Sequence, residues 1–307
     1  MHISRRDIGG LGLALLLGLV GCQTAPVPSV VVPTPPPSAV PPPPPSPPPR
    51  PPRIGLALGG GAARGFAHIG VIQVLDEAGI RPDLAVGTSA GSLVAALWAS
   101  GLDGAALGRM AASMEESTIA DWGFPGRGLL RGDALARYVR ERTGGRPIEQ
   151  LARPLGIVAA DLDSGNAVLF RRGDTGLAVR ASSAVPAVFT PVAISGREYV
   201  DGGLVAPVPV AHARQMGAEL VIAVDIGETP EGKPTGDPFR LLLQTFAIMG
   251  RSISRHELRD ADIIIRPALA GIAGTDFAAR DRAIAAGRAA ALAALPALRA
   301  RLAALTQ

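Results

Sequence analysis

The sequence predicts an α/β domain built on a mainly parallel sheet, and three observations support this prediction. From residue 53 onwards, short apolar runs typical of buried strands alternate with helical runs. The first group is a strand at 54–58, a glycine-rich loop, a helix at 66–78 and a second strand from Leu84, and this β-α-β order implies parallel strands. Hydrophobic residues make up 48% of the 307 residues, enough for one sizeable core.

The first 21 residues have the pattern of an export signal. Arg5 and Arg6 give a positive start, and residues 8–20 form an apolar run too short to span a bilayer as a permanent helix. The run ends in Gly21-Cys22, which resembles the bacterial lipoprotein box, where cleavage before the cysteine leaves that cysteine to carry lipid. We therefore expect Cys22 to anchor the protein in a bacterial cell envelope; an ordinary cleaved signal is the alternative.

The residues around this signal bear on export and sorting. The start Ser4-Arg5-Arg6 leaves general and twin-arginine export both open, because Asp7 displaces the apolar residues that usually follow a twin arginine. Gln23 follows the cysteine where an aspartate could stand, and by resemblance to known sorting behaviour this favours the periplasmic side of the outer membrane.

Residues 22–52 are expected to form a tether between the lipidated cysteine and the folded domain at 53–307. Proline fills 16 of the 27 positions from 26 to 52. Such a segment cannot continue a helix or pair in a sheet and prefers the extended polyproline II conformation. At about 3.1 Å per residue it reaches roughly 80 Å. A ligand for proline-binding modules is the alternative.

The later elements continue the alternation of strands and helices. Strands are expected at 155–160, 167–170, 220–225 and 263–266, and helices at 175–184 and 238–260. Residues 275–305 are rich in alanine, leucine and arginine and predict a helix interrupted near Pro296, because proline breaks the hydrogen-bond ladder of a helix.

Composition excludes several classes of function. Aromatic residues make up only 4%, and the formal net charge of +4 comes from arginines interspersed with acids, so no nucleic acid is expected as a partner. A single cysteine cannot form an internal disulfide or a zinc cluster. Asp161 and Asp163 have the setting of strand-end turn residues, and neither a metal nor another cofactor is expected.

The stretch Gly87-Thr88-Ser89-Ala90-Gly91 carries the strongest functional signal. It joins an apolar strand to a helical run and so matches the nucleophile elbow, G-x-S-x-G, in which the serine is exposed at the N-terminus of the helix. The turn is so tight that side chains at Gly87 and Gly91 would collide with neighbouring backbone. Five residues alone are also compatible with an ordinary strand-turn-helix joint.

The glycine loop at 59–65 permits three interpretations. The spacing is one residue too long for a dinucleotide fingerprint. A phosphate loop needs Gly-Lys-Ser/Thr, and the one lysine of the chain is Lys233. The most economical interpretation is an oxyanion hole, because successive amide N–H groups can point into one cavity. Arg64 can then hold the loop or neutralise an anionic head group.

A nucleophilic serine needs a base, and an aspartate is a better candidate in this sequence than any of the histidines. Asp201-Gly202-Gly203 follows a strand-like segment and exposes a carboxylate in a tight turn, although this tripeptide alone is usually only a turn. Asp225, at the end of another strand, is a rival. Of the four histidines, His2 lies in the signal, and His68 and His212 have helical settings; His256 does too but stays open.

These three motifs, in this order, resemble the signatures of the patatin-like phospholipases, and residues 181–189 resemble the segment that precedes the Asp-Gly motif in that family. The similarity covers roughly residues 53–226. It implies a three-layer α/β/α sandwich and a Ser–Asp dyad without histidine, with Ser89 as nucleophile and Asp201 as base. It places the oxyanion hole in the loop around Gly60, Gly61, Ala62 and Arg64, and the loop's extra residue leaves open which N–H groups point inward.

The resemblance further implies a serine acyl hydrolase that cleaves fatty-acyl esters of phospholipids or lysophospholipids through an acyl-enzyme. Burial is expected to raise the pKa of Asp201 from its usual value near 3.9. Two alternatives remain. A Ser-His-Asp carboxylesterase would use His256, and a non-catalytic module would bind lipid or phosphate through the glycine loop. The sequence leaves the oligomeric state open.

Overall fold

The computed structural model describes residues 50–306 except 116, 118–120, 122–126 and 229–235. The expected signal at 1–21, Cys22 and the proline-rich tether up to residue 49 therefore lie outside the described residues. The chain divides into two units, Met1–Pro47 and Pro48–Gln307, and the described residues all belong to the second unit.

A mainly parallel sheet forms the centre of this unit, as the sequence predicts. Its strand order is β10-β9-β1-β2-β4-β8-β7, with β5 paired to β4. The pairs from β10 to β4 are parallel, and β5, β8 and β7 join in antiparallel fashion. The strands are β1 (Ile54–Leu58), β2 (Leu84–Thr88), β4 (Leu155–Asp161), β5 (Ala167–Phe170), β7 (Val192–Ile194), β8 (Arg197–Asp201), β9 (Leu220–Val224) and β10 (Ile263–Ile265).

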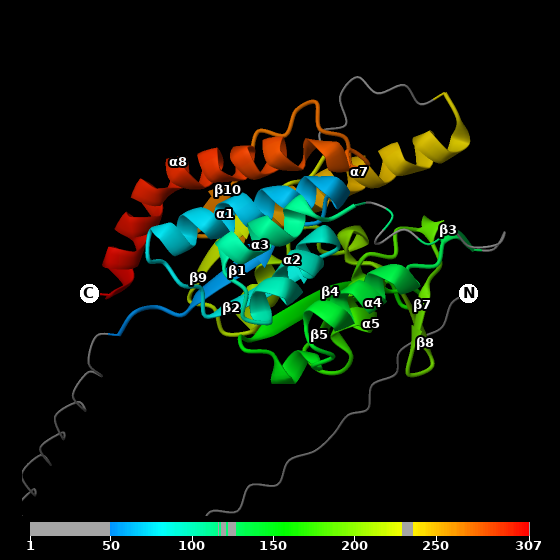
Figure 1. Ribbon diagram of the computed structural model, residues 1–307, viewed down its shortest axis with the longest axis horizontal. Coiled ribbons are helices and arrows are strands. Elements are labelled where there is room, and N and C mark those ends of the chain that lie inside the picture. The colour runs from blue at the N-terminus through cyan, green and yellow to red at the C-terminus, as the bar shows by residue number, and fades with distance from the viewer. Residues whose placement is uncertain (1–49, 116, 118–120, 122–126, 229–235, 307) are drawn as a thin grey trace, which may run out of the picture. The chain divides into compact units, whose positions relative to one another are not determined.

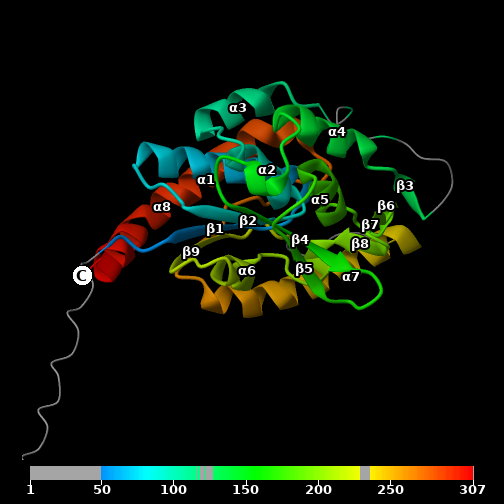
Figure 2. The same ribbon diagram turned by 90° about the horizontal axis from the view of Figure 1, so that it is seen from below.

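Helices cover both faces of this sheet and complete the expected three layers (Figure 2). One face carries α1 (Phe66–Glu77), α2 (Ala90–Ala99), α3 (Gly104–Ala112), α4 (Asp133–Arg142) and α5 (Thr175–Ser182). The other carries α6 (Val210–Gln215) and α7 (Pro238–Glu257). Because β1 is buried on both faces, Leu56 and Leu58 pack into one core cluster and Ala57 into the other.

Several elements differ from those expected from the sequence. Helix α8 (Arg280–Thr306) continues through Pro296, where we expected an interruption, and Figure 1 shows its C-terminal part bending. A proline inside a helix removes one hydrogen bond and causes a kink, which a surface helix tolerates. Helices α3 and α4, strand β7 and the small parallel pair β3 (Gly128–Leu130) with β6 (Ala187–Phe189) were not expected at all.

Helix α8 packs unusually closely on α1, and glycines make this possible. A Cβ atom added to Gly70 would lie 2.0 Å from the carbonyl oxygen of Ile284, and one added to Gly287 would lie 2.0 Å from that of Ala67. Arg288 adds a bidentate ion pair with Glu77. The segment Phe277–Thr306 is long and apolar enough to cross a membrane, but a helix packed on its own domain passes the same test.

We predict that Gly70→Ala destabilises the folded chain, because its methyl group would meet backbone atoms of α8 that cannot move independently. The expected loss is about 2 kcal/mol or more, measured by denaturant unfolding. Gly108→Ala on α3 is the matched control, because the one atom near its Cβ is the mobile end of the Gln73 side chain. An equal effect of both variants would contradict the packing argument.

Candidate active site

The strand-to-helix joint after β2 holds Ser89 in a strained backbone conformation. Its φ of 53° and ψ of −123° are rare for a residue with a side chain, and they turn the serine out of the joint. The two glycines of the motif have no room for a side chain. A Cβ at Gly87 would lie 2.4 Å from the oxygen of Gly91, and one at Gly91 would lie 2.1 Å from that of Leu58.

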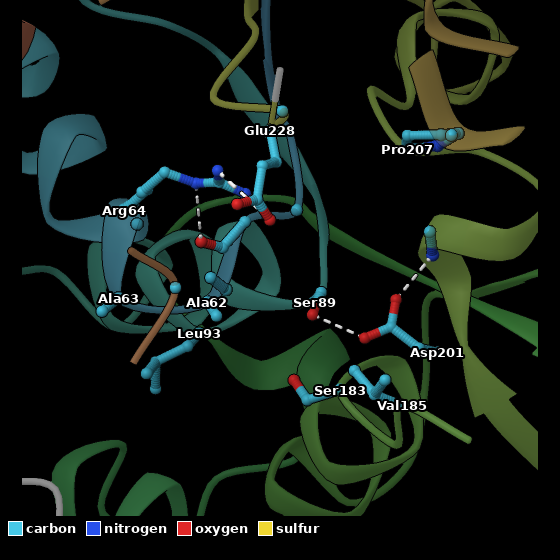
Figure 3. A pocket seen from close by; sticks show the side chains of 18 of the residues that line it. Ala62, Ala63, Arg64, Ser89, Leu93, Ser183, Val185, Asp201, Pro207 and Glu228 are labelled. Atoms are coloured by element: carbon cyan, nitrogen blue, oxygen red, sulfur yellow. Dashed lines mark hydrogen bonds and ion pairs between the residues drawn. The ribbon is translucent and has the colours of Figure 1, made fainter. Parts of the chain in front are cut away.

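The structure brings Ser89 and Asp201 together from strands β2 and β8 (Figure 3). The Ser89 hydroxyl donates a hydrogen bond of 2.6 Å to Oδ2 of Asp201. The other carboxylate oxygen accepts from the amide of Gly203, also at 2.6 Å. A Cβ at Gly202 would lie 2.2 Å from the oxygen of Val158, so glycine is required for this turn to sit against β4. The predicted pair therefore has the geometry of a nucleophile and its base.

The environment of Asp201 changes its acidity. The residue is only 6% exposed. Burial disfavours the charged carboxylate and raises its pKa to about 6, while the hydrogen bonds from Ser89 and Gly203 act in the opposite direction. A carboxylate with this pKa is still ionised at neutral pH, yet it is a stronger base than an ordinary aspartate.

Ser182, at the end of α5, contacts the backbone of Ser89, and the sequence analysis did not identify it. Its hydroxyl accepts a hydrogen bond of 2.8 Å from the amide of Ser89 and donates one of 2.5 Å to the carbonyl of Val158. It thus ties the strained serine to strand β4. Ser182 lies within the segment whose resemblance was noted, but no pattern in that segment indicates which serine faces inward.

The glycine loop corrects one part of the predicted oxyanion hole. The amide of Gly60 donates to the carbonyl of Pro207 at 2.9 Å, and that of Arg64 donates to Gly61 at 3.2 Å, so neither N–H is available to an oxyanion. Gly60 instead leaves room beside the serine, because a Cβ atom added at position 60 would lie only 3.1 Å from the Cβ of Ser89. Within the described hydrogen bonds, the amides of Gly61 and Ala62 in the loop have no acceptor.

Arg64 holds this loop, one of its two expected roles. Its side chain is buried, and Nε donates to the carbonyl of Gly61 at 3.3 Å. Its guanidinium also lies 3.7 Å from the Glu228 carboxylate (Figure 3). Burial lowers its pKa to about 10, so the group stays charged at neutral pH. On the other side of the loop, Nε2 of buried His68 donates to the carbonyl of Gly59 at 2.8 Å.

The alternative bases do not lie at Ser89. No histidine is among the described residues that line the cavity at the serine. His256 is on the exposed side of the last turn of α7. Asp225 does reach the cavity, but its carboxylate accepts from Gly227 and forms an ion pair with Arg266 at 3.1 Å. In the described part of the chain, no group of three or more His, Cys, Asp or Glu side chains could hold a metal ion.

A cavity of about 1250 Å³ opens beside Ser89 and Asp201. One wall is apolar and comes from helices α2, α3 and α4, with Leu97, Leu107, Met110, Leu135 and Tyr138. Its other wall comes from α7 and the strand ends, and carries arginines. The cavity exceeds the roughly 300–1,000 Å³ of ordinary small-molecule sites and can take a long apolar chain.

Fold and site together define a three-layer α/β protein with a serine elbow and an aspartate partner. Residues 56–214 match the family model described as patatin-like phospholipase. This match covers half of the chain, and the protein belongs to the patatin-like phospholipase family, as its three motifs predict.

Individual relatives agree with this assignment. An uncharacterised NTE family protein of Mycobacterium tuberculosis is 41% identical over 185 residues, which cover 59% of this chain and 51% of that protein. The lysophospholipase NTE1 of Coccidioides immitis is 35% identical over 191 residues, 60% of this chain and 12% of the fungal protein. The crystal structure of VipD from Legionella pneumophila shares the fold, with a TM-score of 0.55 at 15% identity over 81% of this chain and 67% of VipD. The chain spans about half the length of the mycobacterial relatives it matches.

We predict that Asp201→Asn gains stability relative to wild type as pH rises. In the folded wild type the pKa of Asp201 is about 6, which is higher than in the unfolded chain. The Asp201 carboxylate therefore begins to lower the stability of the wild type as pH rises above the unfolded pKa, and the full loss is reached above the folded pKa. From pH 4 to pH 8 the difference in unfolding free energy should move by about 2 kcal/mol in favour of the variant. Denaturant titrations at both pH values measure it; a constant difference would contradict the raised pKa.

Proposed function

We propose that this chain is a serine acyl hydrolase that cleaves fatty-acyl esters of phospholipids or lysophospholipids with Ser89 and Asp201. The observation that carries the proposal is the 2.6 Å hydrogen bond from the Ser89 hydroxyl to a buried carboxylate beside a large apolar cavity. Membership of the patatin-like phospholipase family supports lipid hydrolysis, and the lysophospholipase NTE1 among its relatives supports a lysophospholipid as one substrate.

The chemistry proceeds in two halves. Asp201 takes the proton of Ser89 as Oγ attacks the ester carbonyl, and the resulting tetrahedral intermediate carries a negative oxygen. Asp201 then gives the proton to the departing alcohol, and the acyl group stays on Ser89. In the second half Asp201 takes a proton from water, the hydroxide attacks the acyl-enzyme, and Ser89 leaves with that proton as the fatty acid is released.

The amides of Gly61 and Ala62 are the candidate donors to the negative oxygen. Gly61, Ala62 and Ser89 line the same cavity, and the N-terminus of α2 adds the partial positive charge of its helix dipole. Donors of this kind are worth roughly 10²–10³ in rate each. They compensate for a base whose pKa lies far below that of a serine hydroxyl.

The cellular location belongs to the same proposal. We infer that residues 1–21 are removed as a signal, that lipidated Cys22 anchors the protein on the periplasmic side of a bacterial outer membrane, and that the prolines up to residue 52 form the tether. The support is the apolar run before the single cysteine and the 16 prolines that follow it. This arrangement would keep the hydrolase domain beside its lipid substrate.

The test compares the full-length wild type with Ser89→Ala, Asp201→Asn and His256→Ala on a short-chain nitrophenyl ester and on a lysophospholipid. We expect Ser89→Ala and Asp201→Asn to lose at least about 10³-fold in kcat/KM, because each removes one half of the dyad. His256→Ala should stay within about twofold of wild type, because His256 does not line the cavity.

Each alternative has its own outcome in this experiment. Loss of activity in His256→Ala would favour a Ser-His-Asp carboxylesterase. A folded wild type that hydrolyses neither ester but binds lipid would favour the non-catalytic binding module. Full activity in Asp201→Asn would remove Asp201 as the base.

A further inference from the structure

Helix α7 exposes an apolar face to solvent, which we call its outer face. Ser254 is the one buried residue among its twenty. Leu241 and Ile248 are each 54% exposed and Met249 is 48% exposed, and Phe239 and Leu242 are exposed too. Single exposed apolar residues are ordinary on protein surfaces, but a row of them on one helix marks a contact surface.

The opposite side of the same helix belongs to the proposed active site. Leu243, Ala247, Gly250 and Ser254 recur at helical spacing and line the cavity. A Cβ at Gly250 would lie within 4 Å of both Pro207 and Gly203, so α7 rests on the segment that follows Asp201. Helix α7 therefore has one side in the wall of the cavity and the other side on the exposed surface.

Arginines separate these two faces. Arg240, Arg251 and Arg255 line the cavity and are also exposed to solvent, so they lie at its rim. Arg240 also pairs with Asp237 at the start of the helix. The one acidic side chain within α7 itself is Glu257, which turns inward and accepts from the amide of Val208 at 2.9 Å. The part of the cavity rim formed by α7 therefore carries three arginines, and the exposed apolar side chains lie beyond them.

We propose that the outer face of α7 docks on an anionic phospholipid surface and holds the cavity mouth against it. A helix with an apolar face bordered by arginines is the type that lies in the membrane interface, with the apolar side chains in the acyl region and the arginines at the phosphates. The continuity of this face with an acyl-sized cavity favours a bilayer as the occupant. This inference rests on the proposed function, since docking serves the transfer of a lipid into the cavity.

The first test places a reporter on α7. Cys22 is the only cysteine, so a chain with Cys22→Ser and Met249→Cys takes one nitrobenzoxadiazole label, and Ser89→Ala keeps the lipid intact. Leu292→Cys on α8 is the matched control, since Leu292 is 52% exposed. On adding vesicles that contain phosphatidylglycerol, we expect the emission of the label at 249 to rise at least about twofold and shift to the blue.

The control label, and vesicles of phosphatidylcholine alone, should give a much smaller change. An unchanged label at 249, an equal change at 292, or an equal response to both lipids would overturn the proposal. Because no hydrolysis is read out, this result is independent of whether the proposed acyl hydrolase activity is correct.

A kinetic test uses Leu241→Asp and Ile248→Asp, neither of which lines the cavity, with Leu292→Asp as the control. Each α7 variant should hydrolyse phospholipid in anionic vesicles about tenfold more slowly, while kcat/KM on a soluble short-chain ester stays within about twofold. Equal losses on both substrates would overturn the docking role. So would a dimer of the wild type in lipid-free solution that Ile248→Asp dissociates, because the face would then serve self-association.

Discussion

The hydrogen bond between Ser89 and a buried Asp201 is the interaction on which the rest of the site depends. Three neighbouring contacts fix it. Ser182 holds the amide of Ser89, Ala184 accepts from the amide of Asp201, and the carbonyl of Ala206 accepts from the hydroxyl of Thr88. The first two tie the ends of β2 and β8 to the end of α5, and the third ties β2 to the loop that follows β8. A shift of any of these elements would therefore separate Ser89 from Asp201.

This arrangement stores free energy that the fold must supply. A serine with φ of 53° and an aspartate whose pKa is raised to about 6 both cost stability. The parallel strands on either side are completely buried and provide the compensating hydrophobic burial. Proteins commonly concentrate such strain at catalytic positions, which is consistent with the proposed role of this pair.

The parts of the site that follow from packing could be predicted from the sequence, and those that depend on distant partners could not. Gly87 belongs to a turn whose tightness follows from its neighbours Gly91 and Ser92. Asp201 was predicted through the resemblance of the three motifs taken together, because its tripeptide alone is usually only a turn. The role of Ser182 and the use of the Gly60 amide by Pro207 depend on residues more than ninety positions away in the chain. Helix α3 escaped prediction because glycine disfavours a helix and two of its nine residues, Gly104 and Gly108, are glycine.

The most direct test of the central claim is the pH dependence of covalent labelling of the full-length protein by a fluorophosphonate, mapped by mass spectrometry. If the Asp201 carboxylate activates Ser89, the adduct forms on Ser89 alone, and its rate falls about tenfold per pH unit below pH 6, following the raised pKa of Asp201. A rate independent of pH, labelling of another residue, or a titration that disappears in His256→Ala and persists in Asp201→Asn would contradict the account.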